Sequence, residues 1–262
     1  MVDFAAQATQ RPRIVFISSI SSVQAWASIY QTPVTEAPFE DNEAYNVASP
    51  LGYGQSKHVS ERILTQASKE CGIPVTILQV GQVAGSTTST GAAWTTDEWI
   101  PSLASISKTL KLIPSDIPAI HWIPVNKVAQ AICELALAQD NNKEQPDEQL
   151  KIFNVVNPHL ADWGRFVEVL RKRLGDSTRI VTLAEWVDRL ARTDPKSMSD
   201  AEAISSTKIL PLFQHLASTA ASGAALQPKF YTTNSVKMSR AMAEMQAVDG
   251  TLIDLWCQQW GI

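Results

Sequence analysis

The stretch that decides both the fold and the candidate site is residues 51–57, Leu51-Gly52-Tyr53-Gly54-Gln55-Ser56-Lys57. Tyr53 and Lys57 are four residues apart at the start of an amphipathic segment, so a helix places them on one face, one turn apart. A phenol alone, which ionises near pH ~10, exchanges protons poorly at neutral pH, and a neighbouring ammonium favours its phenolate form. The pair predicts a proton-transfer site for a carbonyl group. An ordinary helix start with a surface lysine is the alternative.

The segments on either side of this stretch predict a parallel sheet. Residues 13–19 (RIVFISS) form a short apolar run typical of a strand buried on both faces. A helix is expected over residues 51–70, ended by residues 72–74 (GIP), and a second strand with its following loop over residues 74–85. The apolar positions that recur with helical period are Val59, Ile63, Leu64 and Ala67. The intervening residues 24–49 are polar and contain prolines, which predicts a loop over the site.

A group of serines follows the first predicted strand. Ser18, Ser19, Ser21 and Ser22 stand at its carboxyl end, which is where ligands bind in open α/β sheets. A hydroxyl at this place, beside Tyr53, would hold a carbonyl oxygen. Serines also cap turns, so each of the four has a purely structural alternative.

This order of serines, tyrosine and lysine between strands resembles the extended short-chain dehydrogenase/reductase superfamily, with its Ser/Thr-Tyr-Lys triad. More narrowly, the chain resembles the terminal thioester reductase domains of fungal nonribosomal peptide synthetases, polyketide synthases and adenylate-forming reductases. The narrower resemblance rests on residues 80–85 (VGQVAG), 91–94 (GAAW), 97–103 (DEWIPSL) and 121–126 (HWIPVN). It extends from about Val2 to the C-terminus.

The resemblance implies an oxidoreductase that uses NADPH to release a carrier-bound acyl or peptidyl thioester as an aldehyde or alcohol. Tyr53 would donate the proton, Ser19 would hold the developing oxyanion, and Lys57 would favour the phenolate and hold the nicotinamide ribose. The implied cofactor-binding residues are Ser18, Tyr53, Lys57, Gly81, Gln82 and Val83. The implied partner is an acyl or peptidyl carrier protein with a phosphopantetheine-bound chain. Gln79 stands where these domains commonly carry arginine.

One expected motif is absent. A dinucleotide-binding fold normally places the pyrophosphate at a glycine-rich turn before a helix. The 11 glycines of this sequence never fall into Gly-x-Gly-x-x-Gly. Relative to the family the chain is therefore expected to be N-terminally truncated, with its first βαβ units missing. A partner chain that covers the exposed sheet edge would supply them.

Two other functions follow from the same absence. A non-redox relative would use Tyr53 and Lys57 in cyclising or hydrolytic product release. A non-catalytic relative would act as a docking partner of a synthase. Both keep the fold without requiring a complete cofactor site.

The expected fold is α/β, with a partial Rossmann-like parallel sheet and a mostly helical C-terminal subdomain. Residues 1–160 are expected to form the incomplete core that carries the Ser-Tyr-Lys site, and residues 161–262 the substrate-binding subdomain. The aromatic residues Trp94 and Trp99 are expected to pack in the core or between domains rather than to form a substrate platform.

Composition narrows the class of protein. With 262 residues, 45% of them hydrophobic, and a formal net charge of −4, the chain is long enough for a large core and gives no electrostatic case for nucleic acid. It has no run of 18 apolar residues, so no membrane partner is expected. The expected location is the cytoplasm. Cys71, Cys133 and Cys257 lack metal-ligand spacing, so no metal is expected and the thiols are predicted to be buried.

Overall fold

The computed structural model describes residues 1–38, 46–90, 93–138, 149–221 and 228–262. Of the sequence segments used above, Gly91, Ala92 and residues 39–45 of the predicted loop lie outside these residues. The described chain forms two compact units. Unit 1 comprises residues 1–83, 126–158 and 227–246, and unit 2 comprises residues 84–125, 159–226 and 247–262. The chain therefore crosses between the units several times, whereas the sequence suggested one boundary at residue 160.

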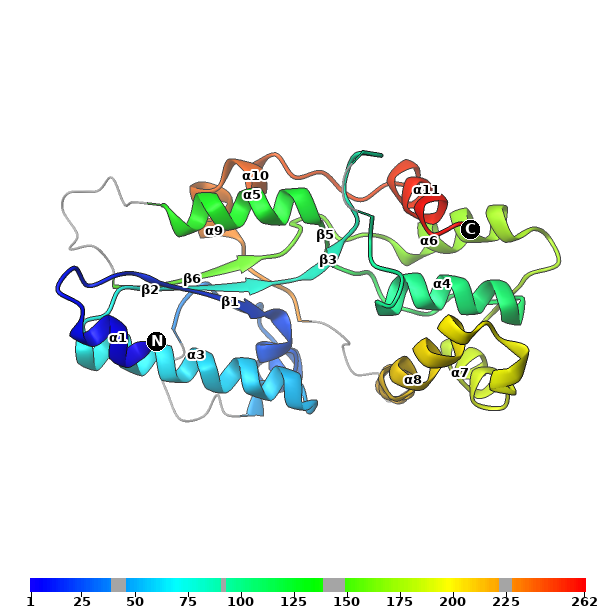
Figure 1. Ribbon diagram of the computed structural model, residues 1–262, viewed down its shortest axis with the longest axis horizontal. Helices are drawn as coiled ribbons and strands as arrows, with labels where there is room; N and C mark the ends of the chain where they lie inside the picture. The colour runs from blue at the N-terminus through cyan, green and yellow to red at the C-terminus, as the bar shows by residue number, and fades with distance from the viewer. Residues whose placement is uncertain (39–45, 91–92, 139–148, 222–227) are drawn as a thin grey trace. The chain divides into compact units, whose positions relative to one another are not determined.

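Unit 1 is built on a three-stranded parallel sheet in the order β1-β2-β6 (Figure 1). Its strands are β1 (Ile14–Ser19), β2 (Val75–Val80) and β6 (Leu150–Val155), and β3 (Gln82–Ala84) follows β2 across the unit boundary. The helices are α1 (Val2–Gln7), the 3-10 helix η1 (Ile20–Val23), α2 (Trp26–Tyr30), α3 (Gly52–Cys71), α5 (Val125–Ala136), α9 (Thr233–Met238) and α10 (Arg240–Ala243). Helices α1 and α3 lie on one face of the sheet and α5 and α9 on the other. This is the predicted Rossmann-like α/β arrangement.

The strand register brings the carboxyl ends of the strands together. Ser19 of β1 pairs with Val80 of β2, and Val80 pairs with Val155 of β6. β2 is buried along its whole length because it lies between two strands and under helices. β1 has only one neighbour among the described strands, and Ile17 is 41% exposed. The prediction that the first strand is buried on both faces is therefore wrong, because β1 is an edge strand here.

Helix α3 begins one residue later and ends one residue later than the sequence predicts. Gly72 ends it in the left-handed conformation, with φ of 63°, which glycine adopts without a steric penalty. Leu64 and Ala67 are buried against Ile14, Val75 and other residues of the sheet. Val59 and Ile63, which share the apolar pattern, are more than half exposed instead. Helix α2 lies in the segment that was predicted to be a loop.

Unit 2 is mainly helical. Its elements are α4 (Trp99–Leu110), β4 (Leu112–Pro114), β5 (Trp122–Pro124), α6 (Trp163–Leu174), β7 (Arg179–Val181), α7 (Leu183–Ala191), the 3-10 helix η3 (Pro195–Ser197), α8 (Asp200–Ala221) and α11 (Gly250–Gln259). Strand β4 pairs in parallel with β7. Among the described residues no helix combines the length and the hydropathy needed to cross a membrane.

Tryptophans form the centre of unit 2. Trp94 is 4% exposed, and its ring centroid lies 5.2 Å from that of Trp256 and 6.1 Å from that of Trp122, both edge-on. A Cβ on Gly85 would come within 2.5 Å of the Trp256 indole nitrogen, so this position requires glycine. The prediction that Trp94 packs in the interior is confirmed. The prediction of three buried thiols is not, because Cys71 and Cys133 are exposed and only Cys257 is buried.

Candidate active site

The four serines at the end of β1 have different environments. Ser18 is buried and donates a hydrogen bond to the Glu61 carboxylate. Ser22 is also buried, and its hydroxyl donates to the Ser19 carbonyl oxygen over 2.7 Å. Ser19 and Ser21 are partly exposed. Of the two hydroxyls that belong to strand β1, only that of Ser19 is therefore partly open to solvent.

Ser19 also has a structural role. It is the N-cap of η1, because its side-chain oxygen accepts a hydrogen bond of 3.2 Å from the Ser21 amide. Its hydroxyl donates to the Ser21 hydroxyl over 3.3 Å, a long contact that a ligand oxygen at normal distance would outcompete. The alternative that these serines cap turns thus holds for Ser19, and it leaves the hydroxyl accessible.

Tyr53 and Lys57 lie one turn apart at the start of α3. The Lys57 ammonium lies 5.7 Å from the centre of the Tyr53 ring and 5.0 Å from the Phe16 ring. It donates a 2.8 Å hydrogen bond to the Ile17 carbonyl oxygen at the outer edge of β1. Tyr53 is 59% exposed. Lys57 therefore connects the start of α3 to the strand that ends in Ser18 and Ser19.

Close packing holds the start of α3 against the serine segment. A Cβ on Gly54 would lie 2.6 Å from the Ser21 carbonyl oxygen and 2.6 Å from the Ser49 Cβ. Real carbon atoms do not approach an oxygen so closely, so this contact requires glycine. The Ser49 amide donates to the same Ser21 carbonyl over 2.8 Å. Sequence reasoning did not identify Gly54, although a glycine directly after Tyr53 inside a predicted helix was a signal for close approach.

A buried polar layer lies beneath these residues, and sequence reasoning did not identify it. Glu61 is 2% exposed and accepts hydrogen bonds from Ser18 and from the Gln79 side-chain nitrogen, the latter over 2.9 Å. Burial raises the pKa of Glu61, and the hydrogen bonds from Ser18, Ser22 and Gln79 offset part of this effect. The signal in the sequence was a glutamate four residues after Lys57, at a helix position that also faces the sheet.

His58 and Gln79 belong to the same buried region. His58 Nδ1 lies 3.1 Å from the Ser22 carbonyl oxygen, and burial lowers the pKa of this histidine. Gln79, which replaces the arginine common in the resembling domains, is fully buried and bonded to Glu61. The Gln79 side chain is therefore not available to a ligand bound at the protein surface.

The third group of predicted residues follows β2. Gly81 comes directly after Val80, the partner of Ser19 in the sheet, and its amide donates to the Val155 carbonyl oxygen over 2.9 Å. The Gln82 side-chain nitrogen donates to the Val83 carbonyl oxygen over 3.0 Å. Gly81, Gln82 and Val83 are each partly exposed. The structure therefore places them at the same end of the parallel sheet as Ser19.

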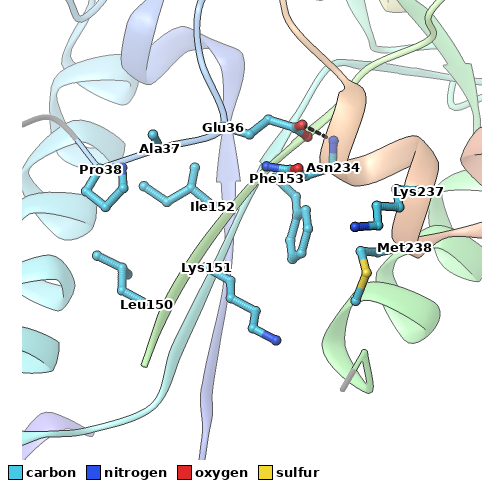
Figure 2. Close-up of a pocket in the computed structure, with 10 residues that line it drawn as sticks. All are labelled: Glu36, Ala37, Pro38, Leu150, Lys151, Ile152, Phe153, Asn234, Lys237 and Met238. Atoms are coloured by element: carbon cyan, nitrogen blue, oxygen red, sulfur yellow. Dashed lines mark hydrogen bonds between the residues drawn. The ribbon is translucent and has the colours of Figure 1, made fainter. Parts of the chain in front are cut away.

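A separate cavity of about 210 Å³ lies along β6 (Figure 2). Its lining residues are Glu36, Ala37, Pro38, Leu150, Lys151, Ile152, Phe153, Asn234, Lys237 and Met238. The Glu36 carboxylate is already used within the protein, because it accepts hydrogen bonds from the backbone amides of Asn154, Asn234 and Ser235. The lining includes none of Ser19, Tyr53 and Lys57, so this cavity is not the predicted site.

A family model matches the first half of the chain. A model described as NAD_binding_4, Male sterility protein, matches residues 1–132. The chain belongs to this family. The nicotinamide dinucleotides are therefore the cofactor class to which the site is related.

Individual relatives agree with this assignment. The chain is 31% identical to a carboxylic acid reductase of Neurospora crassa over 99% of its own length but only 24% of that protein. Its fold is similar to that of the terminal R domain from the myxalamid PKS-NRPS pathway, with a TM-score of 0.70, 22% identity, and coverage of 94% of this chain and 57% of the other. It is also similar to a thiolation-reductase di-domain from an archaeal nonribosomal peptide synthetase, with a TM-score of 0.63, 16% identity, and coverage of 99% and 51%. The chain thus spans about a quarter of the carboxylic acid reductase and a little over half of the solved structures.

The residues present fit one end of a nicotinamide dinucleotide. An exposed phenol, an ammonium and a partly exposed hydroxyl stand at the carboxyl ends of parallel strands, where such ligands bind. The backbone at Gly81 reaches the same end of the sheet. The printed sequence contains no glycine-rich turn for the pyrophosphate. The fit therefore concerns the nicotinamide and its ribose.

Proposed function

We propose that this chain is the catalytic portion of a thioester reductase, which releases a carrier-bound acyl or peptidyl thioester as an aldehyde or alcohol with NADPH. The observation that carries the proposal is the position of Lys57. Its ammonium bonds to the β1 backbone next to Ser18 and lies one turn from Tyr53. A proton donor, a cation and a hydroxyl then belong to one rigid corner of unit 1 in a family of NAD-binding domains.

Each residue has a distinct task in the proposed reaction. The Tyr53 hydroxyl gives its proton to the oxygen of the substrate carbonyl as negative charge develops there. The Ser19 hydroxyl donates a hydrogen bond to the same oxygen, in place of its long contact to Ser21. The Lys57 ammonium stabilises the phenolate that remains on Tyr53 and keeps a further donor for a ribose hydroxyl. A reduced nicotinamide held at this site would supply the hydride for the carbonyl carbon. The resulting hemithioacetal then breaks its C–S bond, the hydroxyl proton passes to the departing pantetheine sulfur, and the free thiol and the aldehyde are the products.

The backbone after β2 would border the cofactor. Gly81, Gln82 and Val83 are partly exposed at the sheet end that carries Ser19, and Ser18 fixes the neighbouring strand end from below. We assign the contacts with the nicotinamide to Gly81, Gln82 and Val83, together with Tyr53 and Lys57. Ser18, which the sequence suggested as a cofactor-binding residue, is buried against Glu61 and has no part in these contacts.

The proposed partner is a carrier protein that presents the acyl chain on phosphopantetheine. The support is the fold similarity to a solved structure in which a thiolation domain and a reductase domain occur together. A second proposed partner is a polypeptide strand at the open edge of β1. β1 has one neighbour among the described strands, and an edge of this kind is a template for further pairing.

The test is reduction of an acyl-pantetheine thioester by the 262-residue chain, followed as oxidation of NADPH or NADH and as aldehyde formation. We expect Tyr53→Phe to lower turnover by about 10²–10⁴-fold while NADPH binding persists, and Lys57→Ala to weaken binding as well. The matched control is Tyr231→Phe, which alters another exposed tyrosine of unit 1. If the folded chain does not bind NADPH at millimolar concentration, it is not a stand-alone reductase.

The same measurements separate the alternatives. A non-redox release enzyme would hydrolyse or cyclise the thioester without a nicotinamide and would still depend on Tyr53. A docking partner of a synthase would do neither and would bind the carrier protein with or without Tyr53.

A further inference from the structure

The site described above stands on a buried polar layer whose function has no assignment so far. Ser18 on β1, Glu61 on α3 and Gln79 on β2 meet in the interior of unit 1, and none of the three is more than 3% exposed. Glu61 connects the other two, because one of its carboxylate oxygens accepts from Ser18 and the other from Gln79. One side chain of the helix therefore holds the ends of two adjacent strands.

Burying such a polar layer costs free energy because its groups lose their hydration. Within the described part of the chain, no lysine or arginine forms an ion pair with Glu61, although Lys57 attracts it electrostatically. A buried carboxyl group without an ion-pair partner destabilises a fold unless hydrogen bonds compensate for the lost hydration. Apolar side chains at these three positions would fill the same space without that cost. The polar groups are thus better explained by the geometry that they fix.

The geometry in question is the direction of Ser19. Successive side chains of a strand point to opposite faces, so a hydrogen bond that holds Ser18 inward turns Ser19 outward. Ser19 then caps η1, whose Ser21 carbonyl packs against Gly54 beside Tyr53. A chain of contacts therefore runs from Glu61 through Ser18 and Ser19 to the start of α3.

We infer that Glu61 is a positioning residue of the active site: through its hydrogen bonds to Ser18 and Gln79 it fixes the end of β1, which keeps the Ser19 hydroxyl out of the buried layer and in its cap of η1, the turn that packs against Gly54 beside Tyr53. The inference rests on the proposed function for its catalytic consequence. Its structural part concerns the order of residues 18–23 and has a readout of its own.

Two substitutions distinguish hydrogen bonding from mere occupancy. Glu61→Gln keeps an oxygen for Ser18 and presents an NH₂ to Gln79. The Gln79 side-chain oxygen has no hydrogen-bond partner among the described residues. If the Gln79 amide rotates, this oxygen can accept a hydrogen bond from the new NH₂ group. Glu61→Leu keeps a similar volume and removes all the hydrogen bonds of the carboxylate. We expect Glu61→Gln to behave like the wild type and Glu61→Leu not to.

The experiment combines hydrogen exchange with kinetics on the full 262-residue chain. In Glu61→Leu the amides of residues 18–23 should exchange faster by mass spectrometry, and kcat should fall by about 10²-fold, the cost of an ~1 Å misplacement, with KM nearly unchanged. Glu61→Gln should restore both. Leu64→Ala is the matched control, because it weakens the core on the same helix without touching the polar layer. It should lower stability while exchange at residues 18–23 and kcat remain those of the wild type.

The outcomes separate the two proposals. Equal exchange at residues 18–23 in Glu61→Leu and wild type, or the same kcat loss in Leu64→Ala, would overturn the positioning role. If Glu61→Leu does not fold, Ser18→Ala removes the same hydrogen bond from the strand side and should reproduce the faster exchange, and unchanged exchange there would overturn the inference. A wild-type chain that reduces no thioester would refute the proposed function, whereas the exchange comparison would still decide whether Glu61 orders the serine segment.

Discussion

The contact between Gly54 and the serine segment leads to a quantitative prediction with an internal control. In Gly54→Ala the new Cβ would lie 2.6 Å from the Ser21 carbonyl oxygen and 2.6 Å from the Ser49 Cβ. An ordinary carbon–oxygen contact is about 3.3–3.6 Å, so helix and serine segment must separate by roughly 0.7–1 Å. Overpacking of this kind costs about 1–3 kcal/mol, and the better helix propensity of alanine returns up to about 1 kcal/mol.

Gly52→Ala supplies the comparison, because Gly52 is in the same helix and a Cβ there would have no neighbour within 4 Å. It should be neutral or stabilising by up to about 1 kcal/mol. We therefore expect Gly54→Ala to be less stable than Gly52→Ala by about 1–3 kcal/mol in urea unfolding followed by circular dichroism. Equal stability of the two variants would refute the claim that α3 is held against Ser21 by this contact. The same separation would move Tyr53 relative to Ser19, so kcat should fall in Gly54→Ala alone.

Three further predictions follow from individual contacts. Tyr53→Phe should lower kcat of thioester reduction by about 10²–10⁴-fold, the usual contribution of a general acid, and an effect as large in Tyr231→Phe would remove Tyr53 from this role. Gly85→Ala should destabilise unit 2 by about 1–3 kcal/mol because its Cβ would meet the Trp256 indole, whereas Gly250→Ala, with only an ordinary contact at 3.6 Å, should not. Tryptophan fluorescence reports on the unfolding of unit 2, because seven of the eight tryptophans belong to it, and equal unfolding midpoints of the two variants would contradict the clash. Burial raises the pKa of folded Glu61 above its unfolded value, so the stability that this group contributes is complete below the ordinary glutamate range and is lost as the pH rises through the folded value. Glu61→Gln removes this titration, so its free energy of unfolding should gain on that of the wild type as the pH rises above the ordinary glutamate range, and a constant difference would contradict the raised pKa of Glu61.

The sequence determined the elements and the end of the sheet at which they meet. The apolar run of β1, the four-residue spacing of Tyr53 and Lys57, and the Gly72 stop of α3 are local patterns, and each is set by backbone geometry that neighbouring residues decide. Parallel strands joined by a helix bring their carboxyl ends together, so the serines, Gly81 and the start of α3 were correctly expected at the same end of the strands.

Only the tertiary structure decided how these residues are used. Ser18 and Ser19 are equivalent in the sequence, and the hydrogen bond that Ser18 donates to Glu61, 43 residues further along the chain, turns Ser18 inward. Gly54 matters because of Ser21 and Ser49, and Val59 and Ile63 are exposed although they share the period of Leu64. The division into two interleaved units likewise depends on contacts between distant segments. Local patterns fix which elements form, whereas the orientation of each side chain depends on which distant segment packs against it.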